Sequence, residues 1–395
     1  MADKRSERSS TFARLWNDPV VRARTFQILT TLVVVYFFWT IYQNTITNME
    51  RRGISTGLGF LDSPAGFGIV MSLIPYSETM TYGRTFWVGL LNTLLVSGLG
   101  IILATILGFI VGIGRLSKNW LASKLSAIFV DTFRNVPLLL QIFFWYFAVL
   151  RNLPGPRESL EFAGTFFLSN RGLKLPAPVP EAGMGVVWLV LLAAIVAAVV
   201  LVRWARKRQE ATGQQFPAVR VGLAMVVALP TLAFVAMGSP LSWDMPELRG
   251  FNFRGGITVI PELGALLAAL TIYTAAFIAE IVRSGIQAVS HGQTEAASAL
   301  GIKRGTTLRL VIIPQAMRVI IPPLTSQYLN LTKNSSLAVA IGYPDLVSVF
   351  MGTTLNQTGQ AVEIVAITML VYLTISLTIS FLMNLYNKAS ALKER

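Results

Sequence analysis

Charged side chains inside apolar segments are the first residues of this chain whose types and spacing could do chemistry. Asp131 and Arg134 lie three residues apart, and so do Glu280 and Arg283. Residues at this spacing share one face of a helix, so each carboxylate can neutralise the guanidinium beside it. We interpret both as intramembrane charge pairs with a structural or gating role rather than as ligand contacts.

Lys333 differs from these pairs because no acidic residue lies within one helical turn of it. It belongs to the polar run 332–336, which interrupts an apolar segment that follows Pro322 and Pro323. A lysine in such a place needs a cavity, an interface or a partner for its ammonium group. Three explanations stay open: a bound ligand's carboxylate, a carboxylate of another subunit, or an ammonium that reaches the membrane surface.

Residues typical of catalysis are scarce in the sequence. There is no cysteine and only one histidine, His291, which excludes thiol catalysis, disulfides and a histidine metal site. Neither a GxxxxGK(S/T) phosphate loop nor an HExxH motif occurs. We therefore expect no catalytic residue, metal or cofactor in this chain, and a separate subunit would have to bind any ATP and Mg²⁺. His291 fits a solvated loop better than a pH switch.

The composition indicates the elements that must position these residues. Of the 395 residues, 53% are hydrophobic and only 13% are charged, whereas soluble domains carry about 25% charged residues. A bilayer is crossed by about 20 apolar residues in a helix. The sequence therefore predicts an all-α polytopic membrane protein with about eight spans, at roughly 26–47, 86–113, 122–150, 185–203, 218–238, 258–282, 319–343 and 362–386.

The distribution of positive charge predicts the orientation of these spans. With the N-terminus in the cytoplasm, the cytoplasmic segments hold 22 Lys and Arg residues and the external segments hold 9. This matches the positive-inside rule, so both termini are predicted to be cytoplasmic. The net charge of +14 is explained by topology and not by nucleic-acid binding. The basic run 203–208 is interpreted as a topology anchor, with an anionic-lipid patch as the alternative.

Small residues recur along the second predicted span. Gly100, Ala104, Gly108 and Gly112 are spaced by four, which places them on one helix face. Small side chains let a neighbouring backbone approach closely, so this ridge predicts tight helix packing. The sequence leaves open whether the neighbour belongs to this chain or to another subunit.

A polar but regular loop separates the sixth and seventh predicted spans. Residues 293–300 are predicted to form a short helix that Gly301 ends in a left-handed conformation. A second, apolar-rich piece around 308–313 is predicted to end at Pro314. Such a loop would either dock against a partner or lie on the cytoplasmic face of its own protein.

The motif in this loop resembles a known family. Glu295, Ala296, Ala297, Gly301 and Pro314 form the pattern EAA-x3-G-x9-V-x-I-P. This pattern resembles the EAA loop of ABC-importer permeases, whose usual ending is I-x-L-P. The resemblance implies that the short helix is a coupling helix seated in a groove of an ATPase subunit. We name residues 286–318 the EAA loop.

Three further stretches resemble the polar amino-acid branch of this family. They are 276–286 (AFIAEIVRSGI), 133–141 (FRNVPLLLQ) and 333–342 (KNSSLAVAIG). The family has glycine where this chain has Asn135 and Ser284. The similarity extends over about 86–150 and 258–390, and it is greatest to the large permeases of general L-amino-acid or glutamate/glutamine/aspartate/asparagine importers, which carry an extra helical pair.

The resemblance implies a division of the chain into four parts. Residues 1–85 would hold a tail, an extra span and an external loop, and 86–150 the first part of a five-helix permease core. Residues 151–257 would form external loops and the inserted helical pair, with 151–184 an irregular proline-rich connection. Residues 258–395 would complete the core and include the EAA loop.

The function implied is that of a permease subunit in the bacterial inner membrane that imports polar L-amino acids. Its partners would be a pair of ABC ATPase subunits, a second homologous permease, a periplasmic amino-acid-binding protein and membrane lipids. An ion-coupled secondary transporter is the alternative. The candidate substrate pathway consists of Asn330, Lys333, Asn334, Ser335, Ser336, Tyr273 and Thr274, where an α-carboxylate would match the lysine ammonium.

Overall fold

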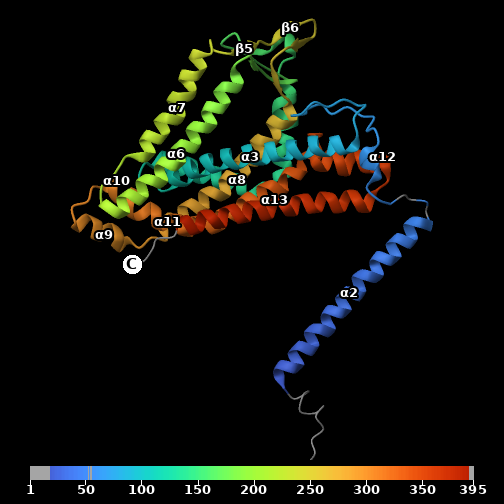
Figure 1. The fold of residues 1–395 in the computed structure, drawn as a ribbon, viewed down its shortest axis with the longest axis horizontal. Helices are drawn as coiled ribbons and strands as arrows, with labels where there is room; N and C mark the ends of the chain where they lie inside the picture. The colour runs from blue at the N-terminus through green and yellow to red at the C-terminus, as the bar shows by residue number, and fades with distance from the viewer. Residues whose placement is uncertain (1–17, 52, 54–55, 391–395) are drawn as a thin grey trace, which may run out of the picture. The chain divides into compact units, whose positions relative to one another are not determined.

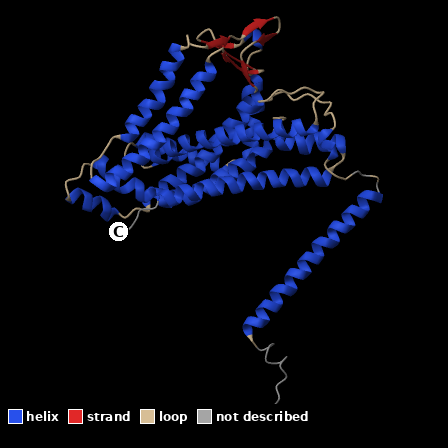
Figure 2. Cartoon of the chain, in the orientation of Figure 1, coloured by secondary structure: helices blue, strands red, loops and turns tan. Residues whose placement is uncertain are grey.

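A computed structural model of the protein describes residues 18–51, 53 and 56–390. Both termini, predicted to be cytoplasmic, lie outside the described residues. The chain is largely helical, and its strands gather in one region (Figure 2). It divides into two compact units, one of 1–89 with 346–374 and one of 90–345 with 375–395. Helices α3 (Tyr82–Arg115) and α13 (Ala361–Ser390) contribute to both units.

The first unit is held together by an aromatic cluster. Phe60 and Phe350 lie with ring centroids 6.2 Å apart, and Tyr82 packs 6.3 Å from Phe60. Leu346 and Ile364 are buried in the same cluster. The other elements of this unit are α2 (Pro19–Arg51), the 3₁₀ turn Gly59–Asp62, the π-helical segment Val347–Thr354 and α12 (Leu355–Thr358).

The second unit is built around one helix, α8 (Pro261–Gln287), whose apolar face is rich in alanine. Small side chains let other helices approach it from several sides, and α4, α5 and α11 all pack against it. Besides α3, α8 and the last part of α13, the α-helices of this unit are α4 (Trp120–Asn135), α5 (Leu138–Phe143), α6 (Met184–Thr212), α7 (Ala218–Ala236), α9 (His291–Ala299), α10 (Arg304–Thr307) and α11 (Ile313–Asn334) (Figure 1).

The small-residue ridge of α3 packs within this chain. A Cβ atom placed on Gly108 would lie 2.6 Å from Cβ of Ile278 on α8, and one on Gly112 would lie 2.7 Å from the carbonyl oxygen of Ala279. Gly100 faces Leu331 of α11. The prediction of close packing is therefore confirmed, and the neighbours, left open by the sequence, are α8 and α11.

The third predicted span, 122–150, is not one straight helix. Helices α4 and α5 meet at an angle of 106°. Pro137 lacks an N–H, and Val136 before it is extended (φ −94°, ψ 128°). The amide of Gln141 donates hydrogen bonds of 3.0 Å to the carbonyls of Phe133 and Val136, which the bend leaves without helical partners. Pro137 therefore interrupts the helix, and the Gln141 amide satisfies two carbonyls next to the interruption.

The connection 151–184 was expected to be irregular, and this expectation is wrong. It contains strands β1 (Leu160–Phe162), β2 (Phe166–Ser169), β3 (Gly172–Leu175) and β4 (Ala177–Pro180). Strands β1, β2 and β3 pair antiparallel with one another, while β3 and β4 also pair with strands that follow the inserted helices, in the orders β1-β2-β3-β8 and β4-β5. These are β5 (Leu241–Asp244), β6 (Glu247–Arg249), β7 (Asn252–Arg254) and β8 (Ile257–Val259). The pairings β3–β8 and β4–β5 join residues distant in sequence, which local patterning could not reveal, whereas β1–β2, β2–β3 and β6–β7 are local hairpins.

Seven described helices are long and apolar enough to cross a membrane, and the bent α4–α5 pair makes eight. The predicted class and the count of about eight spans are confirmed. One span starts earlier than predicted, because helical structure is continuous over 304–341 instead of starting near 319. Pro322 and Pro323 lie inside α11 and do not disturb its start, since a membrane helix tolerates proline where neighbours compensate for lost hydrogen bonds.

Candidate functional site

The EAA loop contains a short helix with a defined end. Helix α9 runs over His291–Ala299, close to the predicted 293–300, and Gly301 has a φ of +69°. The Ile302 amide donates to the Ala297 carbonyl at 3.0 Å, and the Gly301 amide donates to the Ser298 carbonyl at 3.0 Å. These two bonds form a Schellman motif, in which glycine supplies the left-handed residue. The predicted glycine stop is confirmed.

The two faces of α9 have different environments. Ala297 is only 4% exposed and packs within its own chain. Glu295 and Ala296 are exposed on the outer face, and Leu300 at the end of the helix is 78% exposed. The helix is therefore seated on its own protein by one alanine, and the neighbouring acidic and small residues remain accessible to a partner.

Polar contacts fix the orientation of α9. Nδ1 of His291 lies 2.9 Å from Oε1 of Glu295, one turn along the helix. Gln315 of α11 donates to the side chain of Gln293 at 3.2 Å. His291 is thus the first residue of a helix, although it is solvent-exposed as expected. The first contact lies within α9, and the second ties α9 to α11.

The second piece of the loop is longer than predicted. Helix α10, the π-helical segment Leu308–Ile312 and α11 follow one another without a break. Pro314 was expected to end this piece, but it lies in the first turn of α11. Proline inside a helix removes one backbone hydrogen bond, and here the wider π-helical turn directly before Pro314 shifts the hydrogen-bond spacing at that point.

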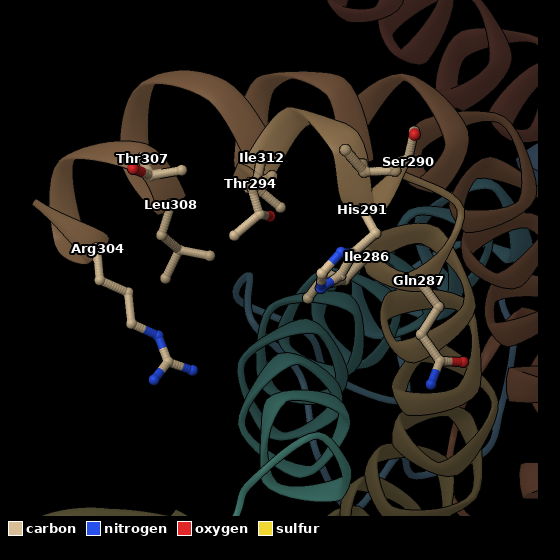
Figure 3. A pocket seen from close by; sticks show the side chains of 10 residues that line it. Ile286, Gln287, Ser290, His291, Thr294, Arg304, Thr307, Leu308 and Ile312 are labelled. Carbon is tan, nitrogen blue, oxygen red and sulfur yellow. The ribbon is translucent and has the colours of Figure 1, made fainter. Parts of the chain in front are cut away.

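A hollow of about 530 Å³ lies between α9 and the segment Arg304–Ile312 of the EAA loop (Figure 3). Its walls come from the end of α8, from α9 and from the α10–α11 segment. Arg304, with its guanidinium, lines the hollow, and so does Leu308. The arrangement offers a partner an open depression with mixed apolar and basic walls, beside the exposed face of α9.

Helices α8 and α11, which lead into and out of the EAA loop, are in close contact. A Cβ placed on Gly285 of α8 would lie 2.4 Å from Cγ1 of Ile320 on α11. Ser284, which stands where the family has glycine, is exposed, whereas the retained Gly285 is buried. Because α8 and α11 touch closely here, the EAA loop, α8 and α11 are expected to move as one unit.

A charge cluster lies in the same part of α8. Glu280 forms ion pairs with Arg283, whose Nε lies 3.2 Å from both of its oxygens, and with Arg115 at the end of α3. Arg283 also hydrogen-bonds to Gln287 at 2.5 Å. The expected pairing of Glu280 with Arg283 is thus present in the structure, with Arg115 as a third member that spacing along one helix could not reveal.

The other expected pair is absent. Among the residues that the structure describes, the Asp131 and Arg134 side chains form no ion pair with each other, and both are exposed. The guanidinium of Arg134 instead lies 5.1 Å from the ring centroid of Phe277 on α8. A cation–π contact with a neighbouring helix competes with a local ion pair, and here it prevails.

The candidate pathway residues lie where α11 ends. Regular α-helix stops at Asn334 and gives way to a 3₁₀ segment, Ser335–Ile341, against which α8 packs. Within the described chain, Lys333 is exposed and has no ion-pair partner. The hydroxyls of Ser335 and Ser336 donate to the backbone. Asn330 is exposed, Asn334 and Ser336 are half-buried, Ser335 and Thr274 are buried, and Tyr273 packs on Phe277.

Sequence reasoning missed several residues with functional potential. Leu300 and Leu310 are apolar yet highly exposed on the EAA loop, and a leucine in an otherwise polar helix was a usable signal. Buried side-chain oxygens that lack a hydrogen-bond partner among the described residues include those of Ser97 on α3, Gln141 on α5 and Thr271 on α8. Their burial depends on helix packing and had no signal in the sequence.

Gly301→Ala is expected to loosen the last turn of α9. No atom would clash with the added methyl group, so the change isolates the left-handed backbone, which costs an L-residue about 1–2 kcal/mol. Amide hydrogen exchange of residues 297–302 should accelerate by about 5- to 30-fold. Gly305→Ala is the matched control, because Gly305 also has free space but no positive φ. Equal acceleration in both variants would contradict the assignment.

The fold and this site define a class of protein: a helical chain with several candidate membrane spans and an exposed helix in the loop between two of them. Among the described residues there is no cluster of potential metal ligands. Residues 212–391 match the family described as the binding-protein-dependent transport system inner membrane component. The chain is 58% identical to YhdX of Escherichia coli (strain K12), provisionally named an amino-acid ABC transporter permease protein, with 96% of each chain covered.

Two further relatives agree. The general L-amino acid transport system permease protein AapQ of Rhizobium johnstonii is 53% identical, with 98% of this chain and 96% of the relative covered. The glutamate/glutamine/aspartate/asparagine transport system permease protein BztB of Rhodobacter capsulatus is 45% identical, with 96% of each covered. The chain therefore belongs to the amino-acid ABC transporter permeases, and it is a multi-pass protein of the inner membrane.

Proposed function

We propose that this permease subunit imports polar L-amino acids of a broad range, driven by ABC ATPase subunits that bind the EAA loop. The observation that carries the proposal is the outer face of α9. It presents Glu295, Ala296 and Leu300 at a helix that buries Ala297 and is hydrogen-bonded through Gln293 to Gln315 of α11. The relatives support the substrate class, since one is named for general L-amino acids and another for glutamate, glutamine, aspartate and asparagine.

The mechanism we infer is mechanical. Glu295 offers a carboxylate to a basic wall of the ATPase groove, and Leu300 offers apolar area beside it. Closure of the ATPase pair then displaces α9, and the close contact at Gly285 passes the displacement to α8 and α11. Alternating access needs no chemistry in this chain, only a bundle with two states that a partner biases from one side.

We infer that the amino acid passes the end of α11. Lys333, with no ion-pair partner within the described chain, would bind the α-carboxylate, and Asn330 and Asn334 would accept or donate hydrogen bonds. The unpartnered buried oxygens of Ser97 and Thr271 join these candidates, because an unsatisfied buried polar group costs about 1–3 kcal/mol. The four-part division of the chain, with the core in 86–150 and 258–395, belongs to the same proposal.

We propose the assembly on similar grounds. A second homologous permease would complete the translocation path, a pair of ATPase subunits would hold ATP and Mg²⁺, and an external binding protein would deliver the amino acid. With both termini cytoplasmic, the EAA loop faces the ATPases and the strands β1–β8 face the binding protein.

Uptake by the reconstituted complex tests this function against the ion-coupled alternative. We expect transport of labelled glutamate and glutamine to need the ATPase subunits and internal ATP. A proton uncoupler should leave it unchanged when ATP is maintained. Transport by the permeases alone, abolished by the uncoupler, would overturn the proposal.

Glu295→Lys is expected to reduce uptake by at least tenfold, because the reversed charge would repel a basic groove wall and weaken ATPase binding. The measurement is copurification of the ATPase together with uptake. Glu210→Lys is the matched control, since Glu210 is also exposed and lies on a segment predicted to be cytoplasmic. Normal ATPase binding and uptake by the Glu295 variant would exclude its docking role.

A further inference from the structure

A groove of about 470 Å³ lies between α6 and α7, near the end where the two helices are connected. The helices pack closely, as a Cβ placed on Gly222 would lie only 3.1 Å from Cβ of Ala198. The groove is therefore a feature of the hairpin itself and not of a junction between the two units. Its lining is apolar along most of its length, with Val199, Val202, Val219, Leu223 and Val226 among the lining residues.

Two arginines line the same groove. Arg203 and Arg206 lie three residues apart on α6, so their side chains leave the helix on one face. Both are exposed, and within the described part of the chain neither forms an ion pair or a hydrogen bond. The neighbouring Arg208 is engaged differently: it hydrogen-bonds to Gln214 at 2.9 Å and lies over the ring of Trp204.

The residues around the two arginines have the composition that is typical of a membrane boundary. Trp204 and Phe216 meet edge to face, 5.9 Å between centroids, beside the basic run. Aromatic side chains gather at the level of lipid headgroups, and lysine and arginine follow just outside the apolar core. The valines and Leu223 then lie at the depth of acyl chains, and the two guanidinium groups lie at the depth of phosphates.

We propose that this groove binds one anionic phospholipid, with an acyl chain along the valines and the phosphate between Arg203 and Arg206. The charge pattern selects this occupant. An apolar groove alone would accept any apolar surface, but two unpaired guanidinium groups at its headgroup end require an anion, and guanidinium binds phosphate through several hydrogen bonds. With the orientation proposed above, the lipid belongs to the cytoplasmic leaflet, whose anionic lipids such basic sites recognise.

A lipid bound in this groove would cover apolar side chains that the hairpin itself leaves exposed. Val219 and Leu223 are 71% and 66% exposed on α7, and a bound chain would cover both. The competing occupant is a helix of a neighbouring permease. It would match the valines, but Arg203 and Arg206 would then lie against an apolar surface without a counter-charge, which is energetically unfavourable. The test below separates the two.

Native mass spectrometry of the assembled transporter tests the proposal, with phosphatidylglycerol and phosphatidylcholine of identical acyl chains as probes. We expect the wild-type transporter to retain phosphatidylglycerol at least tenfold better than phosphatidylcholine. The double variant Arg203→Gln/Arg206→Gln should lose about 25-fold in this retention, from about fivefold for each basic residue at a membrane surface. The matched control, Lys207→Gln/Arg208→Gln, removes the same charge from residues outside the groove and should change retention by less than about threefold.

Val219→Trp supplies a second test that keeps every charge. It fills the groove from an exposed position, so folding is preserved while retention of both phospholipids falls. Three outcomes would overturn the proposal: equal losses in the two double variants, which indicate a diffuse basic surface; no preference for phosphatidylglycerol; or retention by the isolated chain that disappears on assembly, which indicates a partner helix in the groove.

Discussion

Gly108→Val is expected to prevent the accumulation of folded protein in the membrane. A Cβ at this position lies 2.6 Å from both Cβ and Cγ2 of Ile278, and 3.1 Å from the Ala275 carbonyl oxygen. Overpacking of this kind costs about 1–3 kcal/mol where side chains can move aside. Here Cβ of Ile278 cannot move without its backbone, so α3 must separate from α8. Membrane yield and thermal melting of the purified chain measure the effect.

Gly98→Val is the matched control for this prediction. It makes the same substitution on the same helix, but no atom lies within 4 Å of the added Cβ. Its yield and melting temperature should stay close to wild type. Ile278→Ala should restore only part of the stability of Gly108→Val, because it removes Cγ2 and keeps Cβ. Equal damage in the two valine variants would show that valine itself, and not the contact with α8, is harmful.

The ridge on α3 shows what spacing can predict. Its period of four was sufficient to predict a close contact, because small residues on one helix face serve little other purpose in a membrane. The identity of the neighbours was beyond the sequence. Ile278 and Leu331 lie far along the chain, and only the packing of α8 and α11 brings them to Gly108 and Gly100.

The EAA loop shows the same division between local and distant information. Helix α9 and its glycine stop follow from adjacent residues, and both were predicted. The burial of Ala297 depends on how α9 lies against the segment Arg304–Ile312, and the helix continues through Pro314 after a π-helical turn; neither was foreseen. The pairing of β4 with β5 was missed for a related reason, since it joins residues on either side of the whole inserted hairpin.

Charged residues divide in the same way. The Glu280–Arg283 pair lies on one helix and was predicted from its spacing, but Arg115 comes from the end of α3. Asp131 was the expected partner of Arg134, yet the Arg134 guanidinium lies over the aromatic ring of Phe277 on α8. Spacing gives the partners that a residue can reach along its own helix, and tertiary packing decides which partner it takes.

Glu280→Gln is expected to destabilise the second unit and to reduce uptake by about tenfold. The change leaves Arg115 and Arg283 facing each other without a counter-charge, at the point where α3 meets α8. Removing one partner of a fully buried pair costs about 3–5 kcal/mol. The Glu280 side chain is 26% exposed, and solvent screening reduces the expected loss to about 2 kcal/mol. Thermal melting and uptake by the reconstituted complex measure it.

The exposed pair Glu247–Arg249 supplies the control for Glu280→Gln. Both side chains are 64% exposed, so Glu247→Gln should cost less than about 1 kcal/mol. A double-mutant cycle then isolates the cross-helix contact, because Arg115→Gln removes the repulsion that Glu280→Gln exposes. We expect Arg115→Gln/Glu280→Gln to be more stable than Glu280→Gln alone, with a coupling energy of about 1 kcal/mol or more. Additive losses would show that Arg115 and Glu280 do not interact, and the contact that joins α3 to the helix leading into the EAA loop would then have to lie elsewhere, at Gly108 and Gly112.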